Sequence, residues 1–354
     1  MSRKIRGILI TILVLTLAVV AVGEGPAAAA KSKPPFTIAL SNGFIGSEWR
    51  HQMVERAEAV FNYYKEKGLV TGKLIVQHAG LDTTKQIAQI RNMINSRVDA
   101  IIINPNSQTA LNPVIEEAVD AGIVVICIDQ AVTSPKAINV VIDQSRWAAI
   151  SAEWLANKLG GKGNIVAING LAGHPANEDR WRGAKSVFDK HPGIKILTDT
   201  NANWDQATGQ QVMSNLLATY PSIDGVWVQD GMAEGAIKAI LASGRKFPIV
   251  TGEARVGFLK LWKELHDKNP SFTSIGVVNP PGIAASGLHV AMQILQGRKF
   301  KDGALKNGNT LFVPIPGVVT QENFDQYWKE YKDKPDTYTL DGWISEEQAR
   351  SYFK

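Results

Sequence analysis

The segment Ala100-Ile101-Ile102-Ile103-Asn104-Pro105-Asn106 decides the fold class of this chain. A run of apolar residues that stops at an amide and a proline is typical of a strand buried on both faces of a parallel sheet. Proline ends the strand because it has no N–H group to donate to a neighbouring strand. In open α/β sheets, ligands bind outside the carboxyl ends of the strands. The segment therefore places Asn104 where a ligand would lie.

Segments of the same kind recur along the chain and alternate with helical patterns. In a first series, strands are expected at 36–40, 73–76, 100–103, 123–128 and 137–142. A second series begins with a helix at about 145–159 and continues with strands at 164–168, 194–197, 223–228 and 246–250. This alternation predicts an α/β protein with parallel sheets and helices on both faces. Two such series predict two similar lobes, joined by short extended crossings at 138–143, 277–281 and 313–316.

Composition narrows the classes of function. The chain has 354 residues, of which 45% are hydrophobic and 20% charged, as in an ordinary soluble protein of two domains. A net charge of +5 without a dense basic run does not indicate nucleic-acid binding. The single cysteine, Cys127, lies within the apolar run 123–128. It can form no internal disulfide, and we expect a buried, inert thiol.

The amino terminus is expected to be a secretory signal peptide, residues 1–30. A positively charged region at 3–6 precedes an apolar run at 8–22, and Ala28-Ala29-Ala30 forms a small-residue cleavage site. A membrane anchor is the alternative, but the run is short for a span, which needs about 20 residues. The mature chain is therefore expected to begin near Lys31, outside the cytoplasmic membrane.

Polar side chains follow most of the predicted strands. They are planar amides and carboxylates, each able to form two hydrogen bonds: Asn104, Asp129, Asp143, Gln229, Asp230, Glu253 and Asn279. Trp49 and Trp204 begin helices near the same level. A saccharide needs this mixture, because its hydroxyls both donate and accept while its C–H faces pack against aromatic rings. For one residue alone, capping or turn formation is the more common role, but the whole set favours a sugar site.

Several motifs resemble the periplasmic pentose- and hexose-binding proteins of the ribose-binding type. They are Thr37-Ile38-Ala39-Leu40, Ile103-Asn104-Pro105, the run GIVVICID at 122–129, Asp143-Gln144 and the run QDGMAEGA at 229–236. The resemblance covers roughly residues 36–316. It implies the type I periplasmic binding protein fold, with two Rossmann-like lobes joined by three hinge crossings and a sugar bound between them. The implied lobes are 31–142 with 280–312, and 143–279 with 313–354, the latter including a C-terminal extension.

The resemblance also implies a ligand pocket. Its positions in this chain are Ser47, Trp49, Arg50, Asn104, Asp129, Gln130, Asp143, Arg180, Trp204, Gln229, Glu253 and Asn279. Ribose binders usually carry arginine at position 130, asparagine at 229, aspartate at 253 and glutamine at 279, with phenylalanine in place of both tryptophans. These exchanges largely keep the type of hydrogen bond and change its reach. A sugar or polyol other than ribose is therefore expected.

The leading interpretation is an extracytoplasmic binding protein that delivers a sugar or polyol to the permease of an ABC importer. It is expected to be a monomer that closes by hinge bending, with no catalytic residues, metal or cofactor. One alternative is a sensory protein that presents a sugar-like signal, such as a quorum-signal furanose, to a receptor. Another is an extracellular glycosidase that uses Asp129 with Glu253. His174 is expected to be a loop residue, since the histidines lack metal-ligand spacing, and the aromatic residues after Gln321 are expected to pack onto a lobe.

Overall fold

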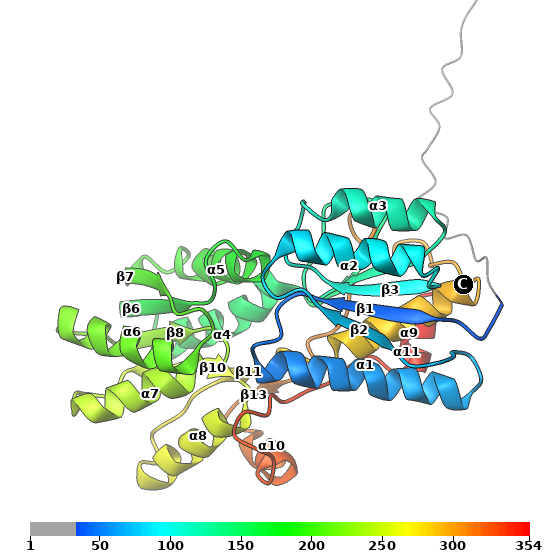
Figure 1. The fold of residues 1–354 in the computed structure, drawn as a ribbon. Coiled ribbons are helices and arrows are strands. Elements are labelled where there is room, and N and C mark those ends of the chain that lie inside the picture. Colours follow the sequence, from blue (N-terminus) through cyan, green and yellow to red (C-terminus); the bar gives the residue numbers. More distant parts are fainter. Residues whose placement is uncertain (1–32) are drawn as a thin grey trace, which may run out of the picture.

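The computed structural model describes residues 33–354. The expected signal peptide at 1–30 therefore lies outside the described residues. Among residues 33–354, every helix is too short or too polar to cross a membrane. The described chain forms two lobes that lie side by side (Figure 1).

The first lobe is built on a parallel sheet of six strands in the order β12-β5-β4-β3-β1-β2. The strands are β1 (Ile38–Asn42), β2 (Ile75–His78), β3 (Ala100–Asn104), β4 (Val124–Ile128), β5 (Ile138–Val141) and β12 (Thr310–Phe312). Helices α2 (Thr83–Asn95) and α3 (Asn112–Asp120) cover one face, and α1 (Glu48–Glu66) and α9 (Ile283–Leu295) cover the other (Figure 1).

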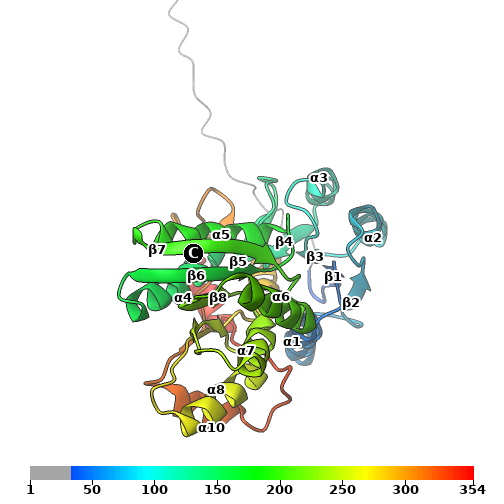
Figure 2. The same cartoon turned by 90° about the vertical axis from the view of Figure 1, so that its left-hand side faces the viewer.

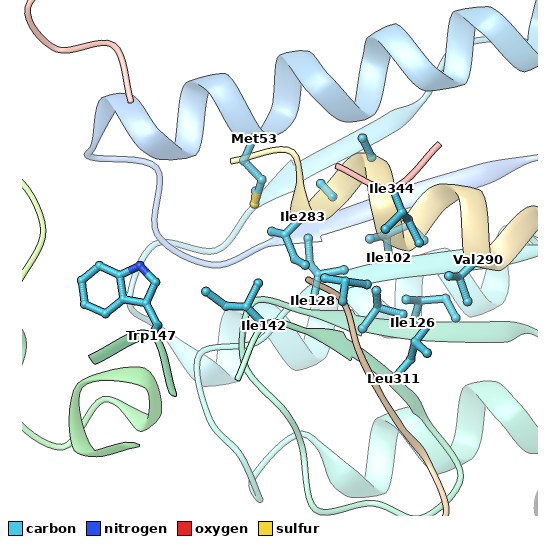
Figure 3. Close-up of a cluster of buried hydrophobic side chains, with 14 of the residues drawn as sticks. Met53, Ile102, Ile126, Ile128, Ile142, Trp147, Ile283, Val290, Leu311 and Ile344 are labelled. Atoms are coloured by element: carbon cyan, nitrogen blue, oxygen red, sulfur yellow. The ribbon is translucent and has the colours of Figure 1, made fainter. Parts of the chain in front are cut away.

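Strand β3 lies in the interior of this sheet, between β4 and β1. Ile102 packs toward α1 and α9, whereas Ile101 and Ile103 pack toward α2 and α3, and all three have 0% exposure. Successive side chains of a strand point to opposite faces, so a strand covered on both faces must be apolar throughout. Figure 3 shows Ile102 beside Ile126 and Ile128, against side chains of α9. The expectation of a doubly buried strand is confirmed.

The second lobe repeats this plan with a parallel sheet of four strands in the order β7-β6-β8-β9. Its strands are β6 (Lys162–Asn169), β7 (Gly193–Asn201), β8 (Gly225–Val228) and β9 (Ile249–Val250), and its helices are α4 (Gln144–Lys158), α5 (Pro175–Phe188), α6 (Gln206–Thr219), α7 (Met232–Ser243) and α8 (Val256–Lys268). Helices α4 and α5 pack on one face, and α6 and α7 on the other. Figure 2 faces this lobe.

Three crossings connect the lobes where extended segments were expected. The chain passes from β5 to α4, from β11 (Gly276–Val277) to α9, and from β12 to β13 (Val318–Val319). Beside the crossings a small sheet joins β10 (Gly252–Glu253), β11 and β13. The α/β class with parallel sheets in two lobes is therefore confirmed.

The C-terminal tail differs from the expected lobe assignment. Helix α10 (Phe324–Tyr331) packs on the second lobe, where the Phe324 and Trp262 rings lie 4.9 Å apart. The chain then returns to the first lobe, where α11 (Glu346–Ser351) packs on α9 and Phe353 stacks on Phe300 at 4.1 Å. The expected boundary keeps the whole of 313–354 with the second lobe. The return occurs because Ile344 and other apolar tail residues join the core of the first lobe (Figure 3).

Candidate ligand-binding site

A cavity of about 390 Å³ lies between the lobes, at the carboxyl ends of the strands of both sheets. Both lobes contribute to its wall. Of the residues expected in the pocket, those that line the cavity are Ser47, Trp49, Arg50, Asp129, Arg180, Trp204, Glu253 and Asn279. The others, Asn104, Gln130, Asp143 and Gln229, lie outside its lining.

The start of α1 supplies the first-lobe wall. Ser47 is the N-cap of α1, but its hydroxyl makes no capping hydrogen bond. Trp49 donates its indole N–H to the carbonyl oxygen of Asn279 at 2.8 Å, which ties α1 to the second crossing. The guanidinium of Arg50 lies 5.2 Å from the Trp49 ring centroid and 3.7 Å from the carboxylate of Asp129. The first turn of α1 therefore presents an aromatic ring and a cation to the cavity.

Asn104 and Gln130 form a layer behind Asp129. Asn104 donates its side-chain N–H to Asp129 Oδ2 at 3.5 Å and accepts from Gln130 Nε2 at 3.2 Å. Gln130 also donates to the carbonyl oxygen of Pro105 at 2.8 Å. Both amides are buried, so they orient the carboxylate that lines the cavity.

Asp143 corrects an expectation that came from the resemblance. It is exposed and caps α4, accepting from the backbone N–H of Arg146 at 2.9 Å. The next residue, Gln144, points toward the site instead. It donates to the backbone oxygen of Asp129 at 3.1 Å and accepts from Arg180 Nε at 2.7 Å. Asp143 is used to satisfy a free N–H group at the start of α4. The hydrogen bonds behind the cavity, to Asp129 and Arg180, are made by the side-chain amide of Gln144 instead.

Gln229 holds the second aromatic wall in place. Its Oε1 accepts from the indole N–H of Trp204 at 3.1 Å, and its Nε2 donates to Asn169 and Asn177 at 3.1 and 3.0 Å. Trp204 has φ of 57°, and the preceding Asn203 has φ of 56°. A bulky residue rarely adopts this left-handed conformation, and such strain tends to gather at functional sites. The conformation turns the Trp204 ring into the cavity.

Charged groups of opposite sign alternate around the cavity. Arg180, with 2% side-chain exposure, pairs with Asp230 at 2.8 Å, and Arg255 approaches Glu253 at 3.4 Å. Burial, with the nearby Asp230, raises the pKa of Glu253 to about 8, although Arg255 opposes the shift. Burial also raises the pKa of Asp129, against the pull of Arg50 and Arg180. With Arg50, Asp129 and Asp205, the wall carries three guanidinium and four carboxyl groups, so a ligand meets charged groups of both signs.

The wall also includes residues that were absent from the expected pocket, among them His174, Asp230 and Arg255. His174 is the N-cap of α5, and its ring meets Trp204 edge-on at 4.8 Å. Burial, with Arg50 and Arg180 nearby, lowers the pKa of His174 to about 3, so the ring is neutral. The signal for this position was Pro175, because proline favours the first turn of a helix. The signal for Arg255 was its spacing of two from Glu253, because alternate residues of an extended segment share a face.

Some buried polar atoms of the wall have no protein partner. Within residues 33–354, Asp230 Oδ1, Glu253 Oε1, Arg255 Nε and His174 Nδ1 make no hydrogen bond. Buried polar groups are nearly always paired in folded proteins, so these atoms point to a ligand. They include both acceptors and a donor, and a hydroxyl group can satisfy either kind.

Comparison with known proteins identifies the family. Residues 38–299 match the periplasmic binding protein domain. This chain belongs to the periplasmic binding protein family. It is 32% identical over 277 residues to a xylitol-binding protein of Mycolicibacterium smegmatis, covering 77% of this chain and 75% of that protein. It is 28% identical over 270 residues to the ribose import binding protein RbsB of Bacillus subtilis, covering 76% and 84%.

A solved structure agrees with these matches. The ABC transporter solute binding protein from Bacillus halodurans, with bound myo-inositol, superimposes with a TM-score of 0.71 at 26% identity, covering 83% of this chain and 98% of that one. The resemblance inferred from the motifs is therefore confirmed, as is the fold of a periplasmic binding protein. The family is one of binding proteins.

Proposed function

We propose that this periplasmic binding protein takes a neutral sugar or polyol into the cavity between its lobes. The observation that carries the proposal is the wall itself. Trp49 and Trp204 line it from opposite lobes, with charged groups of both signs and unpartnered donors and acceptors between them. Aromatic faces suit the C–H surface of a sugar or polyol, and the polar atoms suit its hydroxyls. The relatives named for xylitol and ribose support the same ligand class.

The ligand contacts follow from this wall. We assign direct contacts to Ser47, Trp49, Arg50, Asp129, Arg180, Trp204, Glu253 and Asn279, and we add His174, Asp230 and Arg255. Asn104, Gln130 and Gln229 act behind them by orienting Asp129 and Trp204. A hydroxyl that fails to meet the buried carboxylates would leave them unpaired, which costs affinity. The site therefore selects among hydroxyl patterns.

We further propose that the protein works outside the cytoplasmic membrane as the monomeric solute-binding component of an ABC importer. Ligand binding closes the lobes about the three crossings and so shifts the population toward the form that the permease accepts. The expected signal peptide at 1–30 and the family support this location. Sedimentation of the mature chain with and without ligand would test the monomeric state.

We also propose that the cavity binds its ligand without turning it over. Asp129 lies near Arg50, an arrangement that suits a hydroxyl acceptor. Glu253 lies near Arg255, and its raised pKa lets the protonated carboxyl donate to a hydroxyl as well as accept from one. Incubation with bound saccharides and disaccharides, followed by chromatography, should return them unchanged. A released monosaccharide would favour the glycosidase alternative.

A thermal-shift screen tests the ligand class directly. A ligand that binds only the folded state raises the unfolding midpoint. Xylitol, ribose, allose, arabinose and myo-inositol should be compared with sugar phosphates and amino acids as controls. We expect a shift with at least one neutral polyol or sugar and none with the controls. A panel in which only charged solutes raise the midpoint would overturn the proposal.

A further inference from the structure

A stretch of the tail runs across the two lobes beside the ligand cavity. We call residues 336–346 the interlobe strap. It lies on the path of the tail from α10 at the second lobe to α11 at the first (Figure 1). Within the described chain, the strap links the two lobes in addition to the three crossings.

On the second lobe, the strap pairs with the segment that follows β10. The backbone N–H groups of Val256 and Gly257 donate to the carbonyl oxygens of Tyr338 and Asp336, both at 2.9 Å. The N–H of Leu340 donates back to Ala254 at 2.9 Å. An antiparallel bridge joins Thr339 to Arg255, which lines the cavity. The strap is thus a short strand partner for the segment that carries Glu253 and Arg255.

On the first lobe, the strap is held by α1. Gln52 donates its Nε2 to the carbonyl oxygen of Thr339 at 3.1 Å and accepts from the N–H of Thr339 at 2.9 Å. The side-chain amide therefore takes the place of a peptide group in a neighbouring strand. Gln52 is 3% exposed and Thr339 is 0% exposed. Two hydrogen bonds in a buried setting hold one residue of the strap against the helix.

The same face of α1 makes a second attachment one turn later. Arg56 donates to the carboxylate of Asp341 and to the hydroxyl of Tyr338, both at 2.8 Å. Asp341 also accepts from the backbone N–H of Gly282 at 2.7 Å, at the start of α9. Farther from the cavity, Glu346 accepts from Lys67 at 2.6 Å near the end of α1.

The attachments join the two walls of the cavity. Trp49 and Arg50 lie less than one helical turn before Gln52 on α1, while Glu253 and Arg255 lie on the segment paired with the strap. Thr339 touches both sides, since it bonds to Gln52 and bridges to Arg255. Thr339, a buried residue of the strap, therefore links the Trp49 wall directly to the Glu253 wall.

We propose that the strap is a fourth connection between the lobes and that Gln52 is a positioning residue, which fixes the Glu253–Arg255 segment relative to the start of α1. The consequence for ligand binding rests on the proposed function of the cavity. A protein whose lobes swing freely holds its competent arrangement for only part of the time, and its apparent affinity falls by that fraction. The strap limits this swing and keeps both walls facing one ligand.

The test compares Gln52→Met with Glu346→Gln. The first removes both bonds to Thr339 while keeping the length of the side chain. The second weakens a strap attachment that lies far from the cavity. Spin labels on cysteines introduced at the exposed Asn92 of α2 and Ser214 of α6 report the separation of the lobes in ligand-free protein. We expect a broader distance distribution, extending to longer separations, in Gln52→Met and the wild-type distribution in Glu346→Gln.

The second measurement is affinity for xylitol, or for whichever polyol the thermal-shift screen identifies. Loss of two buried hydrogen bonds predicts about a tenfold weaker apparent affinity in Gln52→Met and an unchanged affinity in Glu346→Gln. An unchanged distance distribution in folded Gln52→Met would overturn the proposal. If that variant does not fold, Gln52→Asn, whose shorter amide cannot reach both atoms, carries the same test. The distance measurement needs no ligand, so failure of the strap and failure of the sugar proposal are distinguishable.

Discussion

Asn104 and Gln229 occupy corresponding places in the two lobes, and each holds a wall of the cavity that it does not itself line. Asn104 ends β3, which is the third strand of its sheet counted from β2. Gln229 follows β8, which is the third strand of its sheet counted from β7. Asn104 donates to the carboxylate of Asp129 at 3.5 Å, whereas Gln229 accepts from the indole of Trp204 at 3.1 Å. The two strand-end amides therefore orient Asp129 and Trp204, and these two residues face the ligand cavity.

Replacing Asp129 and Asp143 separately should distinguish a ligand contact from a helix cap. Asp129→Ala is expected to weaken ligand binding by about 2 kcal/mol or more, because it removes a buried hydroxyl acceptor. Asp143→Ala is the matched control, since this exposed carboxylate caps α4 outside the cavity lining. It should lower the free energy of unfolding by about 1 kcal/mol and leave affinity unchanged. Calorimetric titration and urea unfolding measure both; equal loss of affinity in the two variants would contradict the assignment.

Fluorescence should report ligand binding mainly through Trp204. Of the nine tryptophans, Trp49 and Trp204 line the cavity. Trp49 is buried already, whereas Trp204 is half-buried and shares its indole N–H with Gln229, so a ligand changes its surroundings more. Trp204→Phe is expected to remove most of the emission change on titration with the identified polyol. Trp343→Phe, at an exposed position on the tail, should keep it. A full emission change in Trp204→Phe would place the reporting indole elsewhere.

Glu253 should make stability depend on pH. Burial raises its pKa from 4.5 to about 8 in the folded protein. Between those pH values the folded carboxyl holds a proton that the unfolded chain has released, so the free energy of unfolding falls as pH rises and levels off above pH 8. Glu253→Gln keeps a neutral side chain at every pH, so its free energy of unfolding should fall less as pH rises. Urea unfolding of ligand-free protein at about pH 5, 7 and 9 tests it, with the exposed Glu347→Gln as control; identical slopes would count against the buried neutral acid.

Arg180 and Asp230 should behave as a coupled pair. Arg180 is buried over the Trp147 ring at 4.4 Å and donates to Asp230 at 2.8 Å. Arg180→Met should lower the free energy of unfolding by about 3 kcal/mol or more, because it leaves the carboxylate without its cation. Adding Asp230→Asn should restore part of that loss. Strictly additive effects in urea unfolding would show that the two side chains do not interact.

Much of the architecture could be predicted from local patterns. The apolar run of β3 predicted a strand covered on both faces because each of its side chains must be buried, whichever face it joins. The three crossings were predicted from short extended segments between strand and helix patterns. The same patterns could not place Asp143, because an aspartate before a helix can cap it or bind a ligand, and the choice depends on where the helix start points.

The sequence by itself determined the two α/β lobes, the family and most of the polar strand ends that line or support the cavity. The periodicity of apolar residues and the residue types at strand ends are local properties, so they can be read without knowing any tertiary contact. Only the tertiary structure decided that Asn104 and Gln229 support the wall from behind, that Arg255 and His174 belong to it, and that the tail returns through Thr339 to Gln52. These depend on contacts between residues far apart in the chain, such as the 287 positions between Gln52 and Thr339. No local pattern encodes the partner that a buried amide will meet once the lobes have packed.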